Sequence, residues 1–437
     1  LACLALSPLA AAVSGWRGDG SGVFATATPP TTWDLEKKQN LAWRCDLPGP
    51  SAAAPTVLGD AVYVLADPDL VLCLDLATGA QRWQAFVGLA SKDDAAADAA
   101  AREQLEKAAA ADAKERKPFS EAAAKVAGRK KLERPEMGWT TAAPLCDGER
   151  VYVQTGLGMV AAFDLAGKRL WRVESPGNKG GRWNASPRLV DGHLIISGGS
   201  EAMVALDPST GAVRWSAKWN EPKSGRVGTP ALWQKGGAAF LIASDTTVVR
   251  AKDGTVMSTG GVGSWTEASP VVSGDRVCFT RGDDHSHGEQ FVEAFDLKLE
   301  GETVTFAAAW RTPDRKANKG TFTRVTPLVI GDRLLSIVPG KSALWVETLA
   351  DGKTWAPGVE VNVPAAHHTW RPEPILAGGH LYVPNNEGTV YVVKVDGEKW
   401  SLVHACTFGA PMTAAPTAAG KHLLVRTAKE IVCLGGK

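Results

Sequence analysis

The sequence predicts an all-β fold: an eight-bladed β-propeller of four-stranded antiparallel blades, with one α-helical hairpin inserted. The first observation is a proline that precedes an apolar, strand-like run eight times, at Pro55, Pro144, Pro187, Pro230, Pro270, Pro327, Pro374 and Pro416. The second is the spacing of these prolines, which is 40 to 57 residues except for one gap of 89. The third is that each unit contains short β-rich runs separated by turn residues. Four short strands in a period of about 40–45 residues are typical of propeller blades, which bury their faces against their neighbours.

The first fifteen residues resemble the end of a secretory signal peptide. Residues 1–15 are rich in Leu and Ala and end in small residues around Ala10, Ala11 and Ala12. An apolar run followed by an Ala-x-Ala-like site predicts export, to the periplasm or the extracellular space. Cys3 lies before the apolar run ends, a poor position for a lipid-bearing cysteine. Since no later stretch reaches the roughly 18 apolar residues that a spanning helix needs, no transmembrane segment is expected.

Residues 16–40 are interpreted as an ordered lead-in laid against the propeller. They begin with Trp16-Arg17-Gly18-Asp19-Gly20-Ser21-Gly22. This run is not a phosphate loop, because no Lys-Ser/Thr pair follows it and no strand-to-helix context surrounds it.

The propeller itself is assigned to residues 41–437. In six units the second strand is predicted at 61–65, 150–153, 193–197, 276–280, 333–338 and 380–383. The eighth unit stops one strand short, after residues 430–434. Residues 41–47 are strand-like and have no partner nearby in the sequence, so we expect them to complete the last blade and close the ring. That pairing places Cys45 beside Cys433, and a disulfide between them is one arrangement it permits. The remaining cysteines are scattered without a CxxC motif, which argues against a zinc or redox motif.

Residues 89–137 form the insertion after the first blade. The run Ser91-Lys92-Asp93-Asp94 resembles a capping box, and Ala-rich, charged sequence follows to Lys117. Pro118 interrupts it, and Ser120 can cap a second helix that ends near Lys131. Two interpretations stay open: a solvated decoration, or a docking arm for another protein.

The turn between the third and fourth strands is the most distinctive part of the repeat. Residues 74–83 (LDLATGAQRW) and 206–215 (LDPSTGAVRW) show its full form. Asp, Thr and Gly favour a tight hairpin. The Trp four residues after the Gly is expected to wedge between blades and to donate its N–H to a neighbouring backbone. The fourth copy has Asp253-Gly254 and then Met257 instead of Trp. These turns resemble the pyrroloquinoline-quinone (PQQ) type of repeat, over roughly residues 40–437.

A candidate site lies where loops of one face meet the channel. In a four-stranded meander, the loops after the second and fourth strands emerge on the same face. The residues just before each repeat proline therefore form a ring at the channel mouth, a funnel that suits a planar quinone, a glycan or a peptide. The alternative is that the aromatics only pack successive blades together. The candidate funnel residues are Trp139, Trp183, Asn184, Arg226, Trp265, Glu267, Phe322, Arg324, Trp370 and Arg371.

A loop on the same face offers weak metal candidates, Asp283, Asp284, His285 and His287. Imidazole and carboxylate are reasonable ligands for zinc or copper. No fourth-ligand spacing fixes a site here, and a solvated loop tip explains the same residues.

The resemblance implies two kinds of relative. In the PQQ-dependent dehydrogenases a quinone lies at the channel on a Trp floor, with a calcium or lanthanide held by Glu, Asn and Asp. Glu267, Asn184 and Trp265 offer fragments of that set. The family's adjacent disulfide-bonded cysteines are missing, and no positioned Asp base can be identified. The propeller subunit of the outer-membrane protein assembly machinery is the second relative, and it is non-enzymatic.

We therefore expect an exported, non-catalytic propeller that acts as a protein-interaction scaffold or ligand-binding module at the cell envelope. The partners expected are proteins, contacted through the loop face and residues 89–137, with a glycan as a further option. The alternatives are a PQQ-dependent dehydrogenase using PQQ with calcium, or a carbohydrate-binding or cell-envelope-binding propeller. Unless the chain is a PQQ-dependent dehydrogenase, no cofactor is expected. Lys and Arg number 48 against 47 Asp and Glu, so a general nucleic-acid-binding surface is not expected.

Overall fold

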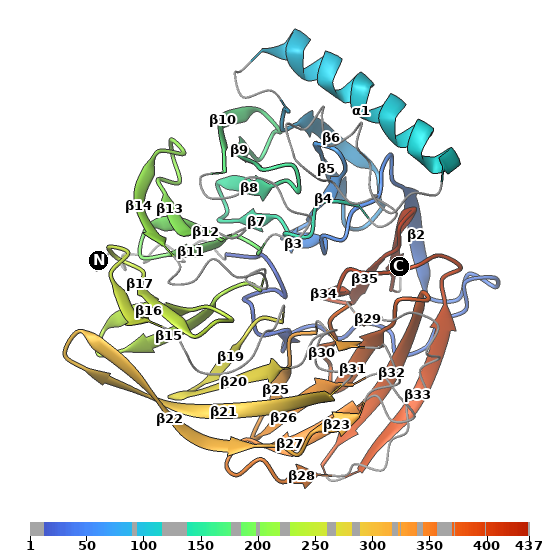
Figure 1. Cartoon of the computed structure of the whole chain (residues 1–437). Coiled ribbons are helices and arrows are strands. Elements are labelled where there is room, and N and C mark those ends of the chain that lie inside the picture. The colour runs from blue at the N-terminus through green and yellow to red at the C-terminus, as the bar shows by residue number, and fades with distance from the viewer. Residues whose placement is uncertain are drawn as a thin grey trace, which may run out of the picture.

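Eight four-stranded antiparallel sheets are arranged around a centre in the computed structural model, which confirms the predicted eight-bladed propeller (Figure 1). The structure describes residues 13–89, 94–115, 138–175, 185–197, 202–218, 228–259, 268–281, 289–316, 322–323, 325–338, 344–355, 369–370, 372–397 and 399–435.

Blades 1 to 4 follow one another along the chain. Blade 1 contains β3 (Thr56–Leu58), β4 (Ala61–Ala66), β5 (Leu70–Asp75) and β6 (Gln81–Phe86). Blade 2 contains β7 (Leu145–Cys146), β8 (Arg150–Gln154), β9 (Met159–Asp164) and β10 (Arg169–Glu174). Blade 3 contains β11 (Arg188–Val190), β12 (His193–Ser197), β13 (Ala202–Leu206) and β14 (Val213–Lys218). Blade 4 contains β15 (Ala231–Lys235), β16 (Ala238–Ile242), β17 (Thr247–Arg250) and β18 (Val256–Thr259).

Blades 5 to 8 complete the ring. Blade 5 contains β19 (Val271–Ser273), β20 (Arg276–Arg281), β21 (Glu289–Glu300) and β22 (Thr303–Arg311), with β23 (Arg315–Lys316) paired to β21. Blade 6 contains β25 (Leu328–Ile330), β26 (Arg333–Ile337), β27 (Leu344–Thr348) and β28 (Thr354–Trp355). Blade 7 contains β30 (Ile375–Ala377), β31 (His380–Pro384), β32 (Thr389–Asp396) and β33 (Lys399–Thr407). Blade 8 contains β34 (Thr417–Ala419), β35 (His422–Arg426), β36 (Glu430–Leu434) and β2 (Leu41–Asp46). The six second strands predicted from the sequence agree with these bounds to within one residue.

The burial of each strand follows its place in the blade. All six residues of β4 are buried, because blades pack on both of its faces. The outermost strand β6 instead alternates between exposed and partly buried residues, since its edge faces solvent at the rim. The continuous apolar runs of the second and third strands in the sequence therefore mark the interior of the disc.

The Trp of one blade packs against the next blade, as predicted, and covers the Gly of its turn. The Trp83 indole donates its N–H to the Leu165 carbonyl at 2.9 Å, and Trp171 donates to the Pro208 carbonyl at 3.0 Å. A Cβ on Gly167 would lie 2.6 Å from the Trp83 ring. The same donation joins Trp43 to Leu76, Trp215 to Ala251 and Trp310 to Leu349. These indoles connect consecutive blades at the turns between third and fourth strands.

Strand β2 closes the ring by pairing antiparallel with β36, as expected for residues 41–47. Arg44 also forms an ion pair with Glu430 at 2.5 Å. The disulfide considered between Cys45 and Cys433 is wrong, because both are free thiols. Cys433 lies opposite Trp43, whereas Cys45 lies opposite Ile431, which makes the two cysteines diagonal rather than direct partners. Diagonal residues are typically about 7–8 Å apart, beyond the reach of a disulfide.

The lead-in crosses the disc from the hub to the rim, on the face that carries the turns between first and second strands. Ser14 and Cys146 exchange backbone hydrogen bonds, and β1 (Val23–Phe24) pairs in parallel with β30. Further along, the N–H of Thr28 donates to the Gly420 carbonyl. Trp33 is then buried, with its ring edge-on to His404. The segment thus spans blades 2, 7 and 8 before it becomes β2.

One helix of the insertion is described, α1 (Ala95–Glu115). Its N-cap is Asp94, whose Oδ1 accepts hydrogen bonds from the N–H groups of Ala96 and Ala97. The cap predicted at Ser91 is therefore three residues too early. The second helix predicted for the hairpin falls on residues 116–137, outside the described residues.

Candidate functional site

Most of the predicted funnel lies outside the described residues. This is true of Trp183, Asn184, Arg226, Trp265, Glu267, Arg324 and Arg371. For Phe322 and Trp370 the structure describes the backbone: β24 (Phe322–Thr323) pairs in parallel with β29 (Thr369–Trp370). This pairing joins the connections that enter blades 6 and 7, so it brings two candidate positions from neighbouring blades together.

Trp139 is the funnel candidate whose side chain is described, and it is buried rather than open to the channel mouth. Its exposed fraction is 3%, and it packs with Leu105 and Ala108 of α1 and with Leu157. The helix therefore covers Trp139.

The metal candidates Asp283, Asp284, His285 and His287 fall on residues 282–288, outside the described residues. Within the part of the chain that the structure describes, no group of three or more His, Cys, Asp or Glu side chains is placed to hold a metal ion.

A buried carboxylate ties the turn after the second strand of blade 1 to the connection that enters blade 2. Asp67 accepts hydrogen bonds from the N–H of Trp139 and from the N–H and hydroxyl of Thr140. Burial raises the pKa of Asp67, although these hydrogen bonds oppose the shift. The two loops meet on one face, in the way that the meander topology requires.

Helix α1 lies at the rim beside β6 and β10 (Figure 1). Two ion pairs fix it there. Arg102 binds both oxygens of Asp69, at 3.0 and 2.8 Å, and its guanidinium lies 3.7 Å from the centroid of the Phe86 ring. Asp98 accepts a hydrogen bond from Arg172 of β10 at 2.7 Å. Bidentate Arg–carboxylate pairs define orientation as well as distance. The helix is therefore held in one pose across blades 1 and 2.

The opposite face of α1 is exposed, with alanines in its first turns and polar residues further along. Its charged residues include Glu103, Glu106 and Lys107, and Gln104 lies among them. Glu103 and Lys107 pair along the helix at 2.5 Å, with side chains 66% and 73% exposed respectively. Since a surface pair of this kind contributes little stability, these residues are not needed to hold the helix in place.

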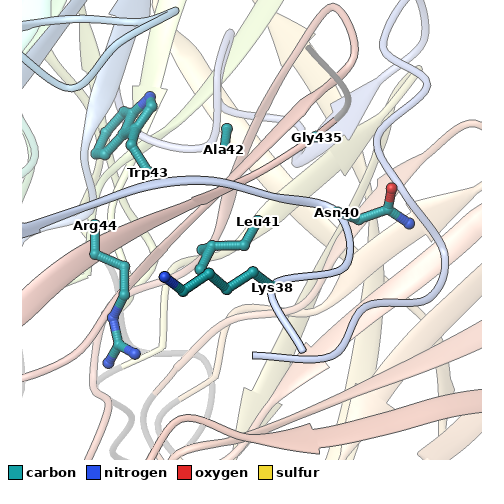
Figure 2. Close-up of a pocket in the computed structure, with 7 residues that line it drawn as sticks. All are labelled: Lys38, Asn40, Leu41, Ala42, Trp43, Arg44 and Gly435. Carbon is teal, nitrogen blue, oxygen red and sulfur yellow. The ribbon is translucent and has the colours of Figure 1, made fainter. Parts of the chain in front are cut away.

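A shallow hollow of about 660 Å³ lies beside β2 at the rim (Figure 2). The Trp43 indole packs at the junction with blade 1, where its N–H donates to the Leu76 carbonyl. Arg44 forms an ion pair with Glu430. Lys38, which also lines this hollow, is exposed. A more enclosed cavity lies at the hub, beside Trp16, and is lined by residues of the lead-in and of blades 2 to 4.

The repeat architecture has a counterpart among known families. The profile of the family described as outer membrane protein assembly factor BamB matches residues 8–116 and 109–298. The chain belongs to this family of PQQ-like repeat β-propellers. No curated protein sequence matches it closely.

Solved structures of PQQ-like propellers share the fold. BamB from Moraxella catarrhalis aligns with a TM-score of 0.55 and 12% identity, over 91% of this chain and 97% of its own. A europium-containing methanol dehydrogenase gives 0.60 and 12%, over 97% and 98%. The quinohemoprotein alcohol dehydrogenase of Comamonas testosteroni gives 0.56 and 12%, over 97% and 81%. At this identity the likeness concerns the fold alone.

Among the described residues, the adjacent disulfide-bonded cysteines of the PQQ-dependent dehydrogenases have no counterpart. The described cysteines, residues 45, 73, 146, 278, 406 and 433, are all free thiols, and no two are adjacent. Of the residues named from the sequence as parts of a quinone site, Asn184, Trp265 and Glu267 lie outside the described residues.

In the part of the chain that the structure describes, no helix is both long and apolar enough to cross a membrane.

Sequence reasoning missed the partners that fix α1 and the charges at the hub. Asp69 and Arg172 lie in blades 1 and 2, far from the helix in sequence. Arg188 and Glu373 could have been found, because each is the charged exception at its position in the eight aligned units.

Proposed function

We propose that this chain is an exported, non-catalytic PQQ-like propeller that holds a protein partner at the cell envelope, with α1 as a docking arm. The observation that carries the proposal is the fixed pose of α1: two ion pairs hold its inner face, while its outer face stays exposed and carries polar residues between Glu103 and Lys107.

The way α1 is attached supports a role for its orientation. Among the side chains of α1 that the structure describes, the apolar ones buried on the inner face are Leu105 and several small alanines such as Ala108, so the two ion pairs contribute strongly to its position. The pairs Arg102–Asp69 and Arg172–Asp98 are largely shielded from water, and they bind in one geometry. A solvated decoration needs no such fixation, whereas a surface that meets a partner does.

Two further observations agree with this proposal. The family that matches is described as outer membrane protein assembly factor BamB. The apolar, Ala-rich start of the chain is typical of exported proteins.

The proposal is tested on the outer face of α1. A photo-crosslinking residue at Gln104 is expected to give one discrete adduct in the envelope fraction of the source cells. The same probe at Leu402, an exposed residue of blade 7, serves as the matched control and should not give that adduct. The double variant Glu103→Lys/Glu106→Lys should weaken binding of the identified partner about tenfold or more, because it reverses the local charge. An unchanged affinity in this variant, with an unchanged melting temperature, would exclude α1 as the docking arm.

A PQQ-dependent dehydrogenase is the second candidate, favoured by the structural likeness to the europium-containing methanol dehydrogenase. Adding PQQ with calcium to the purified chain should then produce the absorbance of bound quinone, lost in Trp265→Ala. If no quinone is bound at saturating PQQ, the dehydrogenase candidate is excluded and the scaffold proposal remains.

A further inference from the structure

Two positions at the hub depart from the eight-fold repeat. The residue that follows the repeat proline is apolar or Thr in seven units but Arg188 in blade 3. The residue that precedes the proline is Ala, Ser or Thr in seven units but Glu373 in blade 7. Equivalent positions of the eight blades have similar packing environments. A charged residue at only one of the eight therefore indicates an interaction specific to that blade.

Both exceptions meet the same tryptophan. Trp16 of the lead-in packs on a buried floor made by Ala54, Ala143, Ala414 and Ala415. Its indole N–H donates to Glu373 at 2.8 Å. The guanidinium carbons of Arg17 and Arg188 lie 5.4 and 5.7 Å from the centroid of its ring. One indole thus organises two cations and one carboxylate.

A cavity of about 180 Å³ opens beside this cluster. Arg188 contributes to its wall, and Trp16 supplies an aromatic surface. The rest of the lining is largely apolar or glycine: Val13, Gly15, Gly18, Gly20, Leu145, Pro187, Leu189, Val190 and Leu232, with Asp19 as a further polar residue. Glycine is favoured at position 20 by its φ of +98°, and Nη2 of Arg188 lies 2.4 Å from where a Cβ would be.

The cationic groups are incompletely paired. Nε and Nη2 of Arg17 and Nε of Arg188 are buried without a hydrogen-bond partner among the described residues. Burial lowers the pKa of Arg188 to about 10, with Arg17 adding to the effect and Asp19 opposing it, so the group remains charged at neutral pH. Asp19 is exposed, and its Oδ1 accepts the N–H of Ser21. A buried guanidinium with unsatisfied donors is costly unless an anion completes it.

We propose that this hub pocket binds a carboxylate that carries a small apolar group, either a free carboxylic acid or the C-terminal residue of a peptide. The carboxylate accepts hydrogen bonds from Arg188, and the apolar group lies against Trp16, Leu189 and Leu232. A planar carboxylate matches the fork of one guanidinium. More highly charged anions are disfavoured, because Asp19 and Glu373 already lie near the cluster.

The binding test uses four probes measured by isothermal titration calorimetry at neutral pH. Isovalerate and an acetylated Gly-Val dipeptide with a free carboxylate represent the two sources of the ligand. Isovaleramide and the amidated dipeptide are their uncharged counterparts. We expect at least one carboxylate to bind with a dissociation constant near or below about 1 mM, and its amide to bind about tenfold more weakly. Binding of isovalerate but not the dipeptide identifies a small-molecule site, and the reverse identifies a chain-end site.

Variants locate the binding. Arg188→Gln should weaken it about tenfold or more, whereas Arg214→Gln, an exposed arginine of blade 3, should leave it unchanged. Asp19→Asn should strengthen it by removing a like charge near the mouth. Leu232→Trp fills the cavity without touching any charge, so it should abolish binding even if Arg188→Gln does not fold. The proposal is overturned if none of the carboxylates binds up to about 10 mM, or if both Arg188→Gln and Leu232→Trp bind as the original chain does.

Discussion

Gly79 has no room for a side chain, because the Trp43 indole of the neighbouring blade covers it. A Cβ would lie 2.5 Å from that ring, and the residue has a φ of +73°. We predict that Gly79→Ala destabilises the fold by about 1 kcal/mol for the backbone conformation and about 1–3 kcal/mol more for the overlap. Thermal unfolding of the purified variant measures the loss.

Gly301 is the matched control for this substitution. It lies in the turn between the long strands β21 and β22, where its φ of +62° is similar but a Cβ would meet no atom within 4 Å. Gly301→Ala should therefore cost only the backbone contribution of about 1 kcal/mol. Equal losses in the two variants would show that the indole does not constrain the turn.

At the residue scale, the sequence predicts contacts that recur and misses those that occur once. The Gly and Trp of the turns are visible because several blades repeat them. Asp67 gives no comparable signal, since its partners Trp139 and Thr140 lie beyond the insertion. The register of Cys45 against Ile431 is equally hidden, because a bulge between Leu41 and Trp43 shifts the strand.

Several turns between third and fourth strands contain an Asp whose pKa is lowered by a neighbouring Arg or Lys. Arg82 holds the pKa of Asp75 down to about 2, together with hydrogen bonds from Thr78. Arg214, Arg250 and Lys353 act in the same way on Asp207, Asp253 and Asp351. A carboxylate whose pKa is lower in the folded chain stabilises the fold above its unfolded pKa of about 4. That stability is lost as the pH falls toward 2.

We therefore predict that the melting temperature falls between about pH 4 and pH 2 partly through these turns. The double variant Asp75→Asn/Asp207→Asn should show a smaller fall over this range, because neither side chain can then titrate. Melting curves from pH 7 to pH 2 measure the effect. Glu174→Gln, which removes an exposed carboxyl at the end of β10 and outside these turns, is the control. A double variant with the same acid slope as the original chain would contradict the prediction.

At the element scale, α1 shows where sequence patterns stop being sufficient. Its Ala-rich composition predicts a helix, but Ser91, Asp93 and Asp94 are all good caps, so the start cannot be chosen from residue type. Its attachment depends on Asp69, in the turn between β4 and β5, and on Arg172 of β10. Composition therefore predicts that a helix forms but does not predict its position or orientation on the propeller.

At the scale of the whole molecule, the number of blades and the closure by residues 41–47 follow from counting strands. The funnel could be proposed from topology, yet the burial of Trp139 depends on where the insertion folds back. The ion pairs of α1 determine where the insertion lies, and the residues that form them are not part of the repeated sequence pattern.

Trp43 lies in the strand that closes the ring, whereas Trp171 performs the same packing between two continuous blades. Replacing either with Ala should cost about 3–5 kcal/mol through lost burial. We predict that Trp43→Ala additionally speeds hydrogen–deuterium exchange in β2 and β36, because the closure opens locally before the molecule unfolds. Trp171→Ala should leave exchange in β2 and β36 close to that of the original chain. Similar exchange of β2 in both variants would argue that the closure is no weaker than the other junctions.

The pairing of β2 with β36 also determines the order in which the molecule can mature. A ribosome releases the chain from its N-terminus, so β2 emerges long before the strand that it must join. During that interval its backbone edge and Trp43 are open to the last blade of any other copy that has already been made. Crowded synthesis would therefore favour exchanged dimers, in which each copy supplies the other's missing strand. Slow dilution during refolding should favour the self-closed ring.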